Sequence, residues 1–168
     1  MMKKFIKLIF ISLCIMFLMG GCFSDVPITQ NVKLLIGFGS GMDFCLINID
    51  ENGIAEYISC SINNADLRNE NIVDEIYEKK EIRLSNRDKT VINELIQEVL
   101  VNEPIKKIVS DGGVEIRVLI EDEKYSSRYH EADPRDYDKN VANLAYKLVE
   151  LAPFNVGGDV NPLRVPND

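Results

Sequence analysis

The chain has 168 residues, of which 46% are apolar and 27% are charged, so we expect one folded domain of ordinary size. This balance excludes a disordered or fibrous chain. Residues 1–21 hold three lysines and no acidic residue, and the remaining residues hold 16 basic and 27 acidic side chains, a formal charge of −11. A polyanionic surface repels phosphate backbones, so we expect no nucleic-acid partner.

The first 22 residues have the pattern of an export signal. Lysines at the start are followed by an apolar run over 8–19 and then by Gly20, Gly21 and Cys22. A basic start, a short apolar run and two small residues are typical of a secretory signal peptide. With a Cys directly after the small pair, the segment resembles the lipobox of bacterial lipoproteins, although Met19 stands where Leu is usual.

This resemblance implies that Cys22 is linked to diacylglycerol and that signal peptidase II removes residues 1–21. The acyl chains, at about 0.8 kcal/mol per buried CH₂, would then anchor the protein to the extracytoplasmic face of the bacterial cell membrane. Two alternatives stay open, an uncleaved signal anchor and an ordinary secretory peptide. The anchor is disfavoured because the apolar run, even extended to Phe23, has roughly 16 residues where a spanning helix needs about 20.

Two further cysteines, Cys45 and Cys60, lie in the exported part and flank a predicted hairpin with Asn52-Gly53 at its turn. A two-residue turn sets these cysteines opposite each other with Cα atoms about 5.5 Å apart, where a strained disulfide can form. A four-residue turn over 50–53 sets them diagonally, too far apart to bridge. Both a disulfide and two small buried thiols remain open.

After the signal segment, we predict a tether over 22–30 and a single globular domain over 31–153. We predict a strand over 32–38, the hairpin over 44–60, an irregular connection over 61–75 and an exposed or edge strand over 76–84. Ser85 is the predicted N-cap of a helix over 86–101, because apolar residues recur there every three or four positions and Pro104 follows.

Strands are also predicted over 106–109, 114–120 and 124–129, the second of them with strict alternation of apolar and polar residues. A second helix is predicted over 136–151, with Pro153 after it, and residues 154–168 are expected to form a loosely attached tail.

This order predicts an α+β domain in which two helices pack on one face of an antiparallel sheet of about five to six strands. The helix residues expected to bury against the 114–120 strand are Val91, Leu95, Val99, Val141, Leu144 and Leu148. In this part the chain resembles small bacterial lipoproteins with a strand-rich start, and that resemblance implies no activity.

Two features of the chain are of the kinds that carry catalysis or bind phosphate. The single histidine, His130, has no accompanying nucleophile motif and is expected in a surface loop. The glycine-rich stretch 37–41 lacks a Walker lysine, so it is expected to be a turn.

The best candidate for a metal site is an acidic loop, whose oxygen atoms could bind Ca²⁺. The loop lacks the spacing and the bidentate Glu of an EF-hand, and Pro134 and Arg135 interrupt it. The ordinary alternative, which we favour, is that Asp133 caps the second helix. We therefore assign no catalytic, cofactor or metal residue. The carboxylates of this loop are Glu131, Asp133, Asp136 and Asp138.

The sequence thus favours a non-enzymatic envelope lipoprotein that binds a protein, peptide or glycan partner. The alternative is an envelope glycan hydrolase, which would need two carboxyl groups about 5 to 10 Å apart in a cleft.

Overall fold

The computed structural model describes residues 25–38, 44–64, 66–101, 114–121, 123–129 and 137–156. Several sequence predictions concern residues outside these ranges. They are the signal segment with Cys22, most of the 37–41 turn, the 106–109 strand, His130, three of the four acidic-loop carboxylates and residues 157–168.

Six strands form one antiparallel sheet in the order β4-β3-β2-β1-β5-β6, which confirms the predicted sheet of an α+β fold. Strands that follow each other in the chain pair directly, except β4 and β5. Instead, β5 pairs with β1 in the middle of the sheet. The strands are β1 Val32–Phe38, β2 Phe44–Ile49, β3 Ile54–Ile62, β4 Val73–Arg83, β5 Val114–Ile120 and β6 Glu123–Tyr129.

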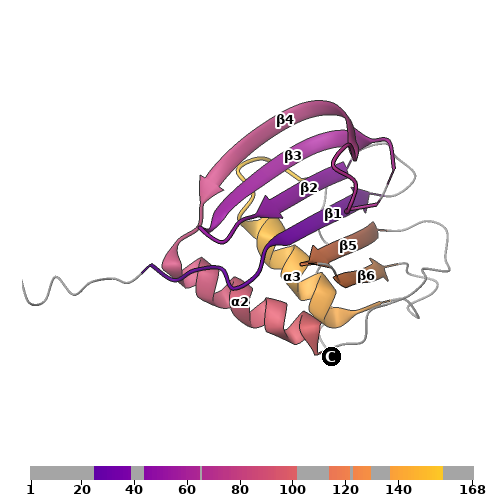
Figure 1. Ribbon diagram of the computed structural model, residues 1–168. Helices are drawn as coiled ribbons and strands as arrows, with labels where there is room; N and C mark the ends of the chain where they lie inside the picture. The colour runs from indigo at the N-terminus through magenta and orange to yellow at the C-terminus, as the bar shows by residue number, and fades with distance from the viewer. Residues whose placement is uncertain are drawn as a thin grey trace, which may run out of the picture.

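Two helices, α2 (Asn86–Leu100) and α3 (Lys139–Glu150), pack together on one face of the sheet (Figure 1). Ser85 caps α2 as predicted, because its Oγ accepts a hydrogen bond from the Asp88 amide at 3.1 Å. The cap of α3 is Asp138, whose Oδ1 accepts from the amides of two first-turn residues. The expected cap at Asp133 is therefore wrong, and the helix begins later than predicted.

The core lies between this inner face of the sheet and the two helices. Alternate residues of the central strands, such as Ile36 and Ile116, are fully buried there. On α2 the buried apolar residues are Ile92, Ile96 and Val99, whereas Leu95 is only half-buried. The prediction for Val99 is therefore confirmed, whereas at Val91 and Leu95 the next residue along the helix is the buried one. The residues predicted from α3, namely Val141, Leu144 and Leu148, are all buried.

The outer face of the sheet carries a second, smaller apolar cluster. Its strand residues include Leu46, Ile58 and Cys60, and the connection between β3 and β4 covers them with Leu67 and Ile72. The predicted irregular connection therefore packs onto the sheet, and it leaves the part of the outer face near the β2–β3 turn uncovered by that cluster.

The β2–β3 turn corrects the expectation for the cysteines. The Gly53 amide donates to the Asp50 carbonyl at 2.9 Å and Ile54 pairs with Asp50, so the loop has three residues, 51–53. This register lies between the two predicted alternatives and sets Cys45 opposite Ser59. Since a one-residue slip moves a side chain to the other face, Cys45 faces the helices and Cys60 the outer cluster. Both thiols are free and buried, and the disulfide is not formed.

The two ends of the described chain are packed more closely than predicted. Residues 25–30, expected as part of the tether, run beside α2 (Figure 1), and Ile28 is only 2% exposed. At the other end, Phe154 packs edge-on against Tyr57 at 6.4 Å between ring centroids, and Val156 is buried. The domain therefore extends from Asp25 to at least Val156.

Candidate functional site on the outer face of the sheet

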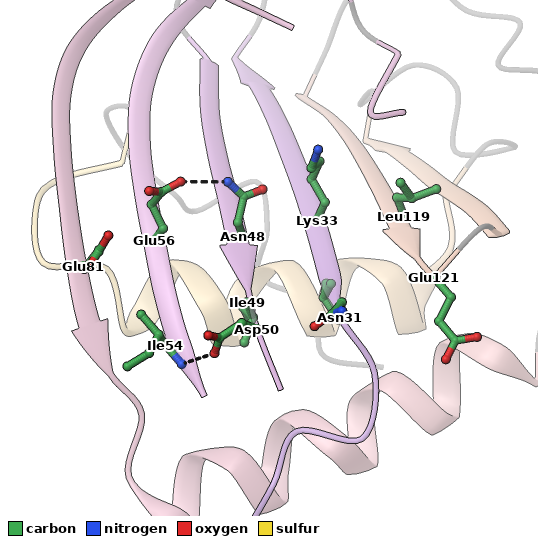
Figure 2. Close-up of a pocket in the computed structure, with 11 residues that line it drawn as sticks. Asn31, Lys33, Asn48, Ile49, Asp50, Ile54, Glu56, Glu81, Leu119 and Glu121 are labelled. Carbon is green, nitrogen blue, oxygen red and sulfur yellow. Dashed lines mark hydrogen bonds between the residues drawn. The ribbon is translucent and has the colours of Figure 1, made fainter. Parts of the chain in front are cut away.

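A row of polar side chains crosses the uncovered part of the outer face. Lys33 of β1 lies opposite Asn48 of β2, Asn48 lies opposite Glu56 of β3, and Glu56 lies opposite Glu81 of β4. Figure 2 shows these side chains on adjacent strands, with the helices behind the sheet. The alternation of each strand places its buried neighbours on the inner face and these polar residues on the outer one.

This row forms the floor of a hollow of about 490 Å³. Leu119 of β5 extends the floor, Ile54 at the start of β3 also lines the hollow, and the loops at this end of the sheet supply Asn31, Asp50 and Glu121. The Asp50 carboxylate is held in place because its Oδ1 accepts a hydrogen bond from the Ile54 amide at 2.7 Å. The hollow is therefore built by residues from five strands and from the loops that join them.

The charge of the hollow is predominantly negative. Four carboxylates line it, those of Asp50, Glu56, Glu81 and Glu121, against a single lysine, Lys33. Carboxylates gathered in a concave surface focus a negative potential and attract cationic groups. The arrangement suits a ligand that carries ammonium or guanidinium groups.

Glu56 is the most constrained of these carboxylates. Its side chain is 23% exposed, accepts a hydrogen bond from Asn48 Nδ2 at 3.0 Å and forms an ion pair with Lys79 of β4. Burial by itself raises the pKa of Glu56, but the bonds from Lys79 and Asn48 outweigh it and hold the pKa below its ordinary value. Glu56 is therefore ionised at neutral pH.

Two polar groups of the row lack a partner within the described part of the chain. Asn48 Oδ1 is buried without a hydrogen-bond partner, and Lys33 has no ion-pair partner among the residues that the structure describes. A buried carbonyl oxygen without a partner is costly, so a donor from a ligand would relieve it. Together they add a hydrogen-bond acceptor and a positive charge to the acidic hollow.

Glu56 does not supply the general acid that the hydrolase alternative needs. A glycan hydrolase needs one carboxyl group that stays protonated near neutral pH while a second is ionised. Glu56, the carboxylate at the centre of the row, has a lowered pKa and is held by Lys79. The arrangement can hold a charged ligand, but at Glu56 it does not provide a general acid.

Of the residues that the sequence singled out, the structure describes Cys45, Cys60 and Asp138, and none of these three lines the hollow. Cys22, His130, Glu131, Asp133 and Asp136 lie outside the described residues. Asp138 is occupied as the cap of α3. Within the described ranges, no three His, Cys, Asp or Glu side chains gather in a way that could hold a metal ion.

Sequence reasoning missed the row itself. Alternation along β1, β2 and β3 marks Lys33, Asn48 and Glu56 as outward-facing, but only the register between strands brings them side by side.

No family model matches the chain, and no curated protein is significantly similar to it. Among the helices described by the structure, none is long and apolar enough to cross a membrane.

Proposed function

We propose that this protein is a bacterial lipoprotein, anchored through Cys22 at the extracytoplasmic face of the cell membrane, whose domain acts as a non-enzymatic binding module. The anchor is supported by the basic start, the short apolar run and the Gly20-Gly21-Cys22 sequence. The observation that carries the binding role is the acidic hollow with the Lys33–Asn48–Glu56 row on the helix-free face.

The partner that fits this hollow is a peptide, a protein segment or an amino-sugar glycan with exposed cationic groups. Its cationic groups would face the carboxylates, and a donor group would reach Asn48 Oδ1. Lys33 would select for a partner that also offers an acceptor or a carboxylate beside its cationic groups. Charges of opposite sign at separate places in the hollow would thus fix the orientation of the bound partner.

The anchor is tested by growing cells with radioactive palmitate. The full chain should incorporate the label and partition into detergent, and Cys22→Ser should abolish the label and leave unprocessed precursor. Full labelling of the Cys22→Ser chain would refute the lipoprotein proposal.

The binding role is tested with the full chain in detergent, titrated with soluble cell-wall peptides, cell-wall glycan fragments and a lysine-rich peptide. Glu56→Gln should weaken binding about tenfold or more, since it removes the most constrained carboxylate of the hollow. Glu98→Gln, a matched change on the exposed side of α2, should leave binding unchanged. Equal affinities of these two variants would contradict binding in the hollow, and turnover of a glycan fragment would favour the hydrolase.

A further inference from the structure

The chain before β1 is fastened to the domain at Asp25. The Lys89 side chain of α2 is 1% exposed, and its Nζ donates to Asp25 Oδ1 at 2.7 Å. Arg83, at the end of β4, lies 3.6 Å from the other oxygen of the same carboxylate. Asp25 is therefore the partner of a buried ammonium group and also contacts a second cation.

Further bonds continue from Asp25 along the side of α2. The Val26 amide donates to Asn86 Oδ1 at 3.2 Å. Asn93, two turns along the helix, donates from Nδ2 to the Pro27 carbonyl at 2.9 Å and accepts from the Thr29 amide at 3.0 Å. We call residues 25–30 the strap.

The strap is also bonded to the β2–β3 turn. The buried Ile28 donates its amide to the Glu51 carbonyl at 3.2 Å. The Lys89 side chain packs against the same turn. It occupies the space that a Cβ atom at position 53 would need, and Gly53 leaves that space free. Because a buried ammonium group without a carboxylate is strongly unfavourable, displacement of the strap would leave Lys89 uncompensated.

We propose that the strap holds one end of the domain against the lipid bilayer, so that the β2–β3 turn, the end of β4 and the start of α2 face the membrane surface. This inference rests on the lipidation of Cys22 proposed above. Cys22 precedes Asp25 by three residues, and three extended residues span at most about 11 Å. A free tether over 22–30 would instead allow roughly 30 Å and any orientation.

The same end of the molecule carries the acidic hollow. Asn31 and Glu121 line it and also line an adjoining hollow of about 440 Å³ beside Ile28 and Glu51. The ligand site is thereby placed near the lipid headgroups. Exposed Glu51 and Glu121 would be repelled by anionic lipids, so chain length rather than charge attraction sets this orientation.

The orientation is tested with full-length lipoprotein in phosphatidylcholine vesicles that carry a nitroxide on the headgroup. Glu51→Cys introduces a labelling site in the β2–β3 turn, at the end of the domain that the strap contacts. Glu75→Cys introduces one in β4, eight residues before Arg83 and therefore about 25 Å from that end. Cys45 and Cys60 are buried, so a fluorophore reacts with the introduced thiol. Quenching by the nitroxide should be about threefold or more stronger at position 51 than at position 75, because position 75 lies about 25 Å further along the strand from the membrane surface.

Variants of the strap give the decisive comparison. Asp25→Asn and Lys89→Met should bring the two quenching values close together, whereas Arg87→Met, an exposed change on the same helix, should preserve their ratio. Circular dichroism checks that each variant is folded. Should Lys89→Met fail to fold, Asp25→Asn supplies the comparison, because the Asp25 side chain is 59% exposed and its replacement leaves no cavity in the core. High salt should leave the ratio unchanged.

Each remaining outcome has a definite meaning. Suppose that the chain with an unaltered strap incorporates palmitate but shows equal quenching at positions 51 and 75. This result would overturn the proposed orientation and leave the lipoprotein proposal standing. An unchanged ratio in both strap variants would overturn the role of the strap. A chain that takes up no palmitate and does not float with vesicles would refute the anchor itself.

Discussion

Gly53 stands where both backbone conformation and packing exclude a side chain. Its φ of 72° lies in the left-handed region, which the three-residue β2–β3 loop requires at this position. A Cβ atom there would collide with the Lys89 side chain. The glycine thus serves the turn and also leaves room for the buried lysine.

Gly53→Ala should lower the free energy of unfolding by about 1 to 3 kcal/mol, because it adds left-handed strain and displaces Lys89. Urea denaturation followed by circular dichroism measures the change. Asn52→Ala, at the exposed neighbouring position, should stay within about 0.5 kcal/mol of the natural chain. Equal effects of the two substitutions would show that the turn tolerates a side chain at position 53.

The two cysteines show how burial decides reactivity. Burial raises the pKa of Cys45 to about 12, with a smaller contribution from nearby Cys60, and burial also raises the pKa of Cys60. Since the thiolate is the reactive form, both should be inert in the folded protein at pH 8.

Alkylation followed by peptide mass spectrometry tests this expectation. Cys45 and Cys60 should resist iodoacetamide in the folded chain and react fully in urea without any reductant. A requirement for reductant in urea would mean that a disulfide had formed after all, and fast labelling in the folded state would mean that the thiols are exposed.

At the scale of elements, α2 shows what helical periodicity leaves open. Apolar residues at Val91, Ile92, Leu95 and Ile96 form two adjacent stripes, and either could face the sheet. The structure buries Ile92 and Ile96 and leaves Leu95 half-buried. Docking against α3 and the sheet, not the helix by itself, selects the stripe.

Ile96→Ala should therefore cost about 2 to 5 kcal/mol of unfolding free energy, since it loses transfer energy and leaves a cavity in the core. Leu95→Ala should cost distinctly less because part of its side chain already contacts water. Urea denaturation of the two variants gives the comparison. A larger loss for Leu95→Ala would mean that the helix is rotated relative to the arrangement described.

At the scale of the whole molecule, ion pairs and hydrogen bonds to carboxylates make stability depend on pH. Three aspartates have a pKa below the ordinary value of 3.8, because each carboxylate accepts a side-chain hydrogen bond. The donors are Lys89 for Asp25, Lys124 for Asp66 and Ser85 for Asp88. The unfolded chain therefore binds more protons than the folded one in mild acid. Their contribution is complete above pH 3.8 and is lost as the pH falls through the lower folded values.

The free energy of unfolding should thus fall on acidification, chiefly below about pH 4. Urea denaturation at a series of pH values measures it. Asp88→Asn should reduce the slope, because Asp88 also joins α2 to α3 through Lys147 at 3.1 Å. A stability that stays constant down to about pH 2 would contradict the role of these carboxylates.

Much of this protein could be predicted from its sequence alone, because the relevant signals are local. Alternation in residues 114–120 identified β5, and Ser85 with the apolar repeat after it identified the start of α2. The order of strands and helices predicted the α+β class, which the structure confirms. The export signal is likewise local, and the lipidation of Cys22 stays a prediction.

Tertiary structure alone decided the register, the strap and the candidate site. One residue of loop length at 51–53 determines whether Cys45 and Cys60 share a face, and alternation along a strand does not encode loop length. Residues 25–30 are polar and contain a proline, so they read as a tether until Lys89 supplies a buried charge that Asp25 must neutralise. The hollow exists because register aligns Lys33, Asn48 and Glu56 across three strands, and such alignment is a property of the folded sheet rather than of any one segment.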